Sequence, residues 1–268
     1  MSEKGARAVQ SIKKNGYLLG VLVRQSIRNQ YYNSVLGILW TVLNPLLNML
    51  VMAFVFSRLF GREGIGLDYP VYVLSGNIVF SLMRTGTVSA LPCLVNQRGL
   101  LTKTKVPIWT FPTAQVFSSV TTFGFSYIAL ILVMLIRLPA GVKFHWTMFM
   151  ALIMLPALIL FTLGMSYILS ALYVYFRDIK HLYSVVVTLW TYLTPLFYSL
   201  ETLKMPDTAM AVMKFNPMYH FVDYFRMTLM GQVPSWRTHL IIYGVGIGFF
   251  IIGLLFFNWR KKTMVLHL

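Results

Sequence analysis

Side chains that could carry out acid–base or metal chemistry are few and scattered along this 268-residue sequence. It has seven acidic residues, five histidines and a single cysteine, Cys93. Asp178 and His181 are close in sequence, but no second carboxylate accompanies them to form an acid–base pair. One cysteine cannot form an intrachain disulfide and makes a metal cluster implausible. We therefore expect no catalytic residues, no metal site and no cofactor bound by this chain.

The acidic residues also bear on how transport could be powered. All seven lie outside the apolar stretches of the sequence, whereas ion-coupled carriers usually keep carboxylates inside the membrane to bind or relay the ion. The sequence also lacks the GxxxxGK[ST] loop that cradles ATP phosphates. If this chain moves a solute uphill, a partner protein must supply the energy.

The composition indicates a membrane protein. Hydrophobic residues make up 57% of the chain and charged residues 11%, against about 45–50% and about 25% in soluble domains. About 20 apolar residues cross a hydrocarbon core of about 30 Å. Six stretches approach or exceed this length: residues 35–56, 71–91, 108–136, 146–173, 182–198 and 240–257. We expect an all-α integral membrane protein with six transmembrane helices.

The basic residues predict the orientation of these spans. If both termini are cytoplasmic, 14 of the 23 Lys and Arg residues fall in inner segments, as the positive-inside bias requires. The net charge of +16 then serves orientation and attraction to anionic membrane lipids. No basic repeat with interleaved aromatics is present, so we expect no nucleic-acid partner.

An amphipathic helix over residues 18–32 is expected to lie along the membrane surface. Residues 1–33 would thus form a cytoplasmic N-terminal segment, and residues 34–268 a single membrane domain. Arg24 and Arg28 are one helical turn apart, where like charges repel, so an anionic neighbour is expected. Lipid headgroups, the phosphate of a transported lipid or a partner carboxylate would each suit. Arg84 lies within the second span and either snorkels, packs, or serves a subunit interface or a phosphate.

The fifth span contains Pro195, which kinks or ends a helix. Beyond it, residues 208–215 and 218–229 have helical periodicity and are separated by Asn216 and Pro217. Neither piece can span a membrane alone. Two short re-entrant helices, at about 208–230, are one interpretation. An amphipathic pair lying flat on the outer surface is the other.

Aromatic residues make up 15% of the chain and gather in the first and fifth spans. They can serve as interfacial anchors or as packing. Alternatively, they line a path on which sugar rings stack. The residues concerned are Trp40, Phe54, Phe56, Trp190, Tyr192, Phe197 and Tyr198.

Several strings closely resemble the permease subunits of polysaccharide-exporting ABC transporters, which export O-antigen, capsule or teichoic acid. They are SVLGILWTVLNPLL (34–47), YPVYVLSGN (69–77), LLTKTKVP (100–107), LYVYFRDIKHL (172–182), TPLFY (194–198) and FNPMYHFVDYFR (215–226). The resemblance implies a homodimer in the bacterial inner membrane with two copies of an ATPase subunit, which bind ATP and Mg. It also implies a lipid-linked polysaccharide as cargo, usually on undecaprenyl diphosphate, as in lipopolysaccharide biosynthesis.

The same resemblance suggests roles by position. Residues 97–106 and 175–181 are similar to the family's two coupling helices, which contact the ATPase. The residues concerned are Arg98, Leu100, Lys103, Lys105, Arg177, Asp178, Lys180 and His181. Asp178 either anchors its loop, pairs with the ATPase or sits in a solvated turn. The broken helices near residues 208–229 are similar to the outer gate, with Asn216, Pro217, Phe221 and Phe225, and the N-terminal helix to the inner gate.

Two other functions are weighed against polysaccharide export. An ABC exporter permease for a drug or a small lipid is the alternative within transport, and an ATPase gene among sugar-transferase genes would favour the polysaccharide. A membrane glycosyltransferase or acyltransferase would need acid–base or metal-binding side chains close together at the membrane face, which the sequence lacks.

Overall fold

The computed structural model describes residues 16–28, 37, 39–40, 43–44, 46–47, 51, 67–103, 106–198, 211 and 213–267. Within these ranges the regular elements are helical, which confirms the all-α prediction for this part of the chain. Most of the first predicted span, including Phe54 and Phe56, lies outside the described residues, as do Lys105 and half of residues 208–215.

The described elements, in chain order, are all helices. They are a helix over residues 16–28, α3 (Tyr69–Ala90), α4 (Cys93–Asn96), α5 (Arg98–Lys103), α6 (Thr110–Ile136), the 3-10 helices η2 (Leu138–Ala140) and η3 (Trp146–Met150), α7 (Ala151–Tyr175), α8 (Ile179–Leu193), α10 (Pro217–Leu229) and α11 (Trp236–His267).

Three of these helices are long and apolar enough to cross a membrane: Thr110–Ile136, Trp146–Tyr175 and Trp236–Lys261. They coincide with the third, fourth and sixth predicted spans. Helix α3 has 22 residues, but Asn77 and Arg84 lower its hydropathy. Helix α8 has only 15 residues and stops at Leu193, because a residue preceding a proline, here Thr194 before Pro195, disfavours helical backbone angles. Six spans therefore remain a prediction.

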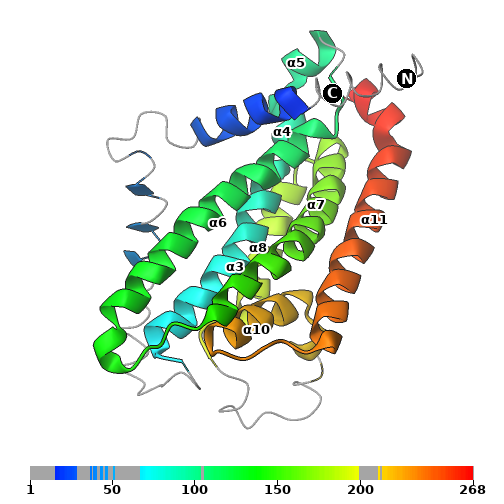
Figure 1. The fold of residues 1–268 in the computed structure, drawn as a ribbon. Coiled ribbons are helices and arrows are strands. Elements are labelled where there is room, and N and C mark those ends of the chain that lie inside the picture. Colours follow the sequence, from blue (N-terminus) through cyan, green and yellow to red (C-terminus); the bar gives the residue numbers. More distant parts are fainter. Residues whose placement is uncertain are drawn as a thin grey trace, which may run out of the picture.

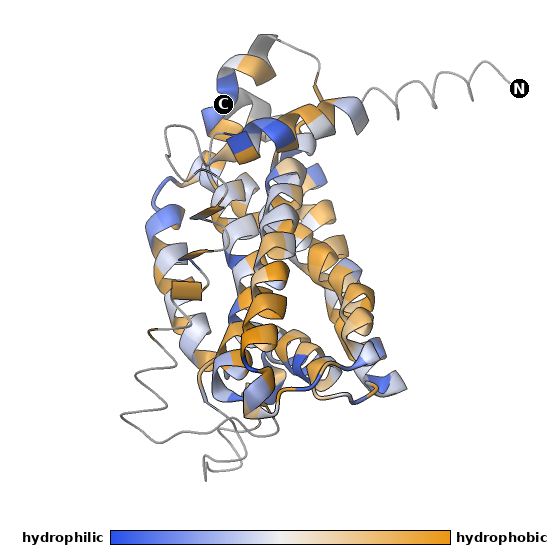
Figure 2. Cartoon of the chain, turned by 60° about the vertical axis from the view of Figure 1, so that its left-hand side comes forward, coloured by the Kyte–Doolittle hydropathy of each residue, from blue (hydrophilic) through white to orange (hydrophobic). Residues whose placement is uncertain are grey.

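The long helices form one bundle with two different ends (Figure 1). Helices α3, α6, α7 and α11 run along its body, with α11 packed on α7 and α3 on α6. The 16–28 helix, α4, α5 and the C-terminal part of α11 lie at one end, which we call the 16–28 end (Figure 1). Helix α10 crosses the opposite end, the α10 end (Figure 1). Figure 2 shows hydrophobic residues along the middle of the bundle and hydrophilic residues concentrated toward its ends.

Glycines hold α7 and α11 in close contact. A Cβ added at Gly164 would collide with the backbone of Phe249, and one added at Gly246 would lie 2.5 Å from the carbonyl oxygen of Ala157. Small residues at helix contacts let backbones approach closely, which is how helices associate in a membrane without help from water. Helices α7 and α11 therefore pack backbone against backbone at these glycines.

One predicted element is corrected by the structure. Residues 175–181 do not form a separate helix, because α7 ends at Tyr175, residues 176–178 form a turn and α8 begins at Ile179. Residues 98–103 of the other predicted coupling segment do form a short helix, α5.

Candidate functional site

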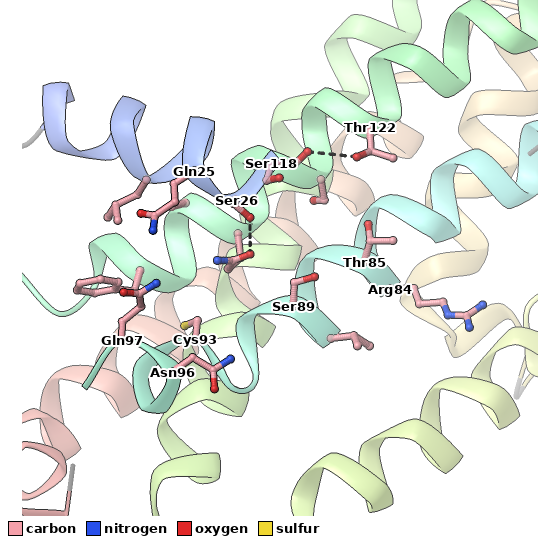
Figure 3. Close-up of a pocket in the computed structure, with 16 residues that line it drawn as sticks. Gln25, Ser26, Arg84, Thr85, Ser89, Cys93, Asn96, Gln97, Ser118 and Thr122 are labelled. Carbon is pink, nitrogen blue, oxygen red and sulfur yellow. Dashed lines mark hydrogen bonds between the residues drawn. The ribbon is translucent and has the colours of Figure 1, made fainter. Parts of the chain in front are cut away.

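A cavity of about 660 Å³ lies at the 16–28 end, between the 16–28 helix, α3, α4 and α6 (Figure 3). Its lining is dominated by neutral polar side chains. The amides are Gln25, Asn96, Gln97 and Gln115, and the hydroxyls are Ser26, Thr85, Ser89, Ser118, Ser119 and Thr122. Arg84 is the single charged residue among the sixteen that line the cavity, and none of them is acidic.

Three hydroxyl groups of this cavity, those of Thr85, Ser119 and Thr122, donate to a backbone carbonyl of their own helix. Thr85 donates to the carbonyl of Ser81 at 2.7 Å, and Ser119 to that of Val116 at 2.7 Å. Such bonds satisfy the hydroxyl proton. The hydroxyl oxygen keeps its acceptor lone pairs, so the cavity wall can still receive hydrogen bonds.

One wall of the cavity is the 16–28 helix. Ser26 Oγ donates a hydrogen bond to Gln115 Oε1 of α6 at 2.8 Å, and Leu22 is buried in a cluster that includes Phe111 and Ala114. This wall is thus attached by a polar contact and an apolar contact to α6. The helix 18–32 predicted from the sequence is present over residues 16–28, and residues 29–32 lie outside the described part.

The three arginines singled out from the sequence take different positions. Arg24 and Arg28 are exposed on the 16–28 helix and do not line the cavity. Arg84 does line it, and its guanidinium points away from the 16–28 helix (Figure 3). The structure thus connects Arg84, and not Arg24 or Arg28, with the polar cavity.

The residues predicted to contact an ATPase lie near the same end. The end of α7 meets that of α11, where Tyr175 donates to the carbonyl of Arg260 at 3.5 Å. Leu100 is half-buried against the cluster that contains Leu22. Lys103 is the last residue of α5, and its side chain lies outside the described part of the structure. Five of these residues are exposed: Arg98 on α5, Arg177 and Asp178 in the turn after α7, and Lys180 and His181 in the first turn of α8.

Cys93 also lines the cavity, and its thiol is buried. Burial raises the pKa of Cys93, because the thiolate would lose its hydration there. A thiol that stays protonated is a poor nucleophile, so Cys93 should react slowly with labelling reagents.

At the α10 end, Asn216 connects two helices. Its Oδ1 accepts from the backbone N–H of Met218, capping α10, and from Trp190 Nε1 at 2.7 Å. Its Nδ2 donates to Thr194 Oγ1 at 2.9 Å and to the carbonyl of Leu193 at 3.3 Å. Asn216 with Pro217 was predicted to separate two helical pieces, and α10 does begin at Pro217.

Arg226 is a structurally important residue that sequence reasoning missed. It is 5% exposed. It donates to the carbonyls of Pro195 at 2.7 Å, Leu196 at 3.0 Å and Tyr72 at 3.1 Å. Its guanidinium carbon lies 3.5 Å from the centroid of the Tyr72 ring.

A signal for Arg226 did exist in the sequence. Arg226 falls in phase with the buried positions Val222 and Leu229 on α10, one turn away on either side. A cation on the apolar face of a helix requires a buried set of acceptors. The segment just after α8 supplies two of them, the carbonyls of Pro195 and Leu196, and α3 supplies the carbonyl of Tyr72.

The predicted aromatic path is described only in part. Trp190 is half-buried, with edge contacts to Phe80 and Phe161 at ring-centroid distances of 6.5 and 6.2 Å. Tyr192 is 66% exposed and Trp40 is 37% exposed. Phe197 and Tyr198 are half-buried, and their carbonyls accept hydrogen bonds from Tyr69 and Tyr72. The structure therefore gives Trp190 a packing environment and leaves Tyr192 accessible.

Two residues of the predicted outer gate lie inside the bundle. Phe221 and Phe225 are fully buried. Phe221 contacts Phe161 at 5.7 Å between ring centroids, and Phe225 contacts Tyr127 at 6.0 Å. Within one chain they are core residues of α10.

An ion pair links the end of α6 to the start of α3 at the α10 end. Arg137, after α6, donates to both carboxylate oxygens of Asp68, before α3, at 2.9 and 2.6 Å. This hydrogen bonding raises the pKa of Arg137. Among the described residues, no three His, Cys, Asp or Glu side chains come together as metal ligands could.

An apolar helical bundle with a polar cavity at one end, and with exposed charged connections beside it, is the arrangement of a membrane transport protein. The sequence pattern of the ABC-2 type transporter family matches residues 17–230, and the chain belongs to this family. It is a transporter permease, not an enzyme, and ATP hydrolysis belongs to a separate subunit.

Individual relatives agree with this assignment. The chain is 31% identical over 212 residues to the O-antigen export system permease protein RfbA of Myxococcus xanthus, covering 79% of this chain and 80% of the relative. It is 28% identical over 249 residues to the RfbA protein of Klebsiella pneumoniae, covering 92% and 94%. It is 23% identical over 248 residues to the polysialic acid transport protein KpsM of Escherichia coli, covering 91% and 93%.

Proposed function

We propose that this chain is the membrane subunit of an ATP-driven exporter that moves a lipid-linked polysaccharide of the O-antigen type out of the cytoplasm. The family match over residues 17–230, with relatives named for O-antigen export, carries the proposal. The carrier lipid would be undecaprenyl diphosphate, and the membrane the bacterial inner membrane. Two ATPase subunits would bind ATP and Mg and drive a homodimer of this chain.

The arrangement of the bundle supports a cytoplasmic 16–28 end. The 16–28 helix, α5, the α7–α8 turn and the basic end of α11 all belong to this end, so the positive-inside bias favours placing it in the cytoplasm. The exposed charges at α5 and at residues 177–181 are then available to an ATPase. On this orientation, α10 lies toward the outer leaflet, where we propose that it acts as a re-entrant helix of the outer gate.

Helix α8 supports a second copy of the chain. An apolar face of α8 is exposed, with Leu182 65%, Val185 58% and Leu189 58% accessible. With 15 residues, α8 is also short for crossing a hydrocarbon core alone. Pairing of α8 across a homodimer would cover this face, and the exposed Tyr192 at its end would then lie beside a path for the polymer.

Deletion and complementation test the proposal. Removing the gene should abolish the surface polysaccharide and cause a lipid-linked polymer to accumulate in the cytoplasm, and the wild-type gene should restore export. Asp178→Lys should insert normally but lower export and ATPase stimulation, because it reverses the acid of the α7–α8 turn. Lys143→Glu, a charge reversal in the exposed loop before η3, is the matched control. Normal surface polymer in the deletion strain would reject the proposed function.

A further inference from the structure

The cavity at the 16–28 end selects for a particular ligand chemistry. Amides and hydroxyls both donate and accept hydrogen bonds, which suits a neutral ligand rich in hydroxyl groups. The single cation Arg84, with no acid among the lining residues, suits an anion beside that group. A hydrophobic drug would instead require mostly apolar walls.

The volume of the cavity fits the same ligand. Pockets that enclose small organic ligands measure about 300 to 1,000 Å³, and this one measures about 660 Å³. Ser118 and Ser119 are each only 5% exposed, yet both line it. A polar cavity of this size inside a membrane bundle must hold water or a polar ligand.

The order of the lining residues gives the ligand a direction. Arg84 lies six residues, or about 9 Å along the axis, from the end of α3 at Ala90. Asn96 and Gln97 lie beyond that end, toward the surface of the bundle, and Gln25 faces them from the 16–28 helix (Figure 3). An anionic group therefore fits beside the exposed Arg84, nearer the middle of the bundle, and a neutral hydroxylated group fits closer to the 16–28 end.

We propose that this cavity binds the head of the cargo lipid, with its phosphate at Arg84 and its first sugar between Gln25 and Asn96. This inference rests on the proposed function and adds to it a site for cargo selection. The lipid tail would extend past Arg84 into the bilayer, and the remaining polymer would emerge past Gln97. Selection would thus depend on the sugar next to the lipid and not on the length of the polymer.

Protection of an introduced cysteine tests occupancy of the cavity. Ser89→Cys in a Cys93→Ala background, assembled with the ATPase in vesicles, should react with a maleimide. Undecaprenyl diphosphate carrying one N-acetylhexosamine should slow this reaction about fivefold or more. The lipid without sugar should protect less, and vesicles of phosphatidylglycerol should not protect. Asn258→Cys, exposed near the end of α11 and outside the cavity, is the control and should label equally in all arms.

Substitutions in the cavity test which group reads the sugar. Gln25→Ala and Asn96→Ala should each weaken binding of the glycosylated lipid about 3- to 10-fold, the effect of losing one hydrogen bond, and leave the sugar-free lipid unchanged. Arg84→Gln should weaken both lipids alike. Arg237→Gln, on α11 near the α10 end, removes the same charge away from the cavity and should weaken neither.

The possible results separate this inference from the proposed function. Equal protection by phosphatidylglycerol, or no protection by the glycosylated lipid, would overturn the cavity assignment, even where deletion of the gene still abolishes export. Unchanged lipid preference in both amide variants would also overturn the sugar contact. The proposed function would be rejected by a different result, normal surface polysaccharide in the deletion strain.

Discussion

The polar side chains at the two ends of the bundle differ in what they contact. At the α10 end, polar side chains bond to partners within the chain: Arg226 donates to three carbonyls through its two Nη atoms, while its Nε has no partner among the described residues, and Asn216 bonds to partners on α8 and α10. At the 16–28 end, amides and hydroxyls face a cavity, and the charged residues of the α7–α8 turn are exposed.

This difference separates structural from binding roles. Internal hydrogen bonds fix one arrangement of helices, because a buried polar group without a partner is costly. Polar groups that face a cavity cost less while water fills it, and they remain available to a ligand. The comparison predicts that substitutions at the α10 end affect mainly stability, and those at the 16–28 end mainly binding.

Arg226→Met should have the largest effect on stability. It removes the Arg226 donor from the carbonyls of Pro195, Leu196 and Tyr72, of which the Tyr72 carbonyl still accepts from Ser75 Oγ, so the free energy of unfolding should fall by about 3 kcal/mol or more. Arg226→Lys should be intermediate, since a single ammonium group cannot reach three carbonyls in the fork geometry of a guanidinium. Thermal unfolding in detergent measures both.

Gly76→Ala provides a second way to disturb Arg226 without removing its charge. A Cβ at residue 76 would lie 2.7 Å from Arg226 Nη2, so the guanidinium must shift from its acceptors. Gly99→Ala on α5, where a Cβ meets no atom within 4 Å, is the matched control. A midpoint for Arg226→Met equal to that of wild type would contradict a structural role for this residue.

Much of the fold could be predicted from hydrophobic periodicity and proline positions. The apolar runs at 108–136 and 146–173 match α6 and the η3–α7 segment to within a few residues, and Pro195 marks the region where α8 ends. Long apolar stretches and prolines determine where helices lie through local sequence alone, so helix positions can be predicted from them without knowledge of tertiary contacts.

The polar interactions could not be predicted in the same way. The cavity joins Ser26, Arg84 and Gln115 from three helices, and their spacing in sequence does not indicate that they meet. Phe221 and Phe225 were predicted at a gate, and their burial against Phe161 and Tyr127 depends on how α10 is seated. Asn216 was recognised as a break between helices, but its bond to Trp190 requires the packing of α8 on α10.

Asn216→Ala should have the second-largest effect. It removes the cap of α10 and the contacts with Trp190 and Thr194, and loss of a cap alone costs about 0.5 to 2 kcal/mol. Asn216→Asp keeps the acceptor oxygen, so it should retain the cap and the bond from Trp190 but lose the amide donor. Trp fluorescence during thermal unfolding follows both changes. Equal midpoints for the alanine and aspartate variants would show that the acceptor contributes nothing.

Asp68→Asn should have a smaller effect that depends on salt. Arg137 is 42% exposed at its side chain, and ion pairs this accessible contribute about 0.2 to 1 kcal/mol. The difference in midpoint between Asp68→Asn and wild type should shrink from 50 mM to 500 mM salt, since salt screens exposed charges. A difference that is constant across this range would indicate a role for Asp68 other than the ion pair.

Ser26→Ala should have a small effect on overall stability and a clear local effect. It removes the hydrogen bond to Gln115, a partly buried neutral bond of the kind that contributes about 0.5 to 1.5 kcal/mol, but Leu22 still holds the 16–28 helix against α6. Amide hydrogen exchange should therefore quicken in residues 16–28 and stay unchanged in α10, because local opening of one helix need not involve the opposite end. Faster exchange at both ends would mean that the two ends open together, and the comparison between them would fail. Faster exchange confined to the 16–28 helix would show that this wall of the cavity can move while the Arg226 and Asn216 contacts stay fixed.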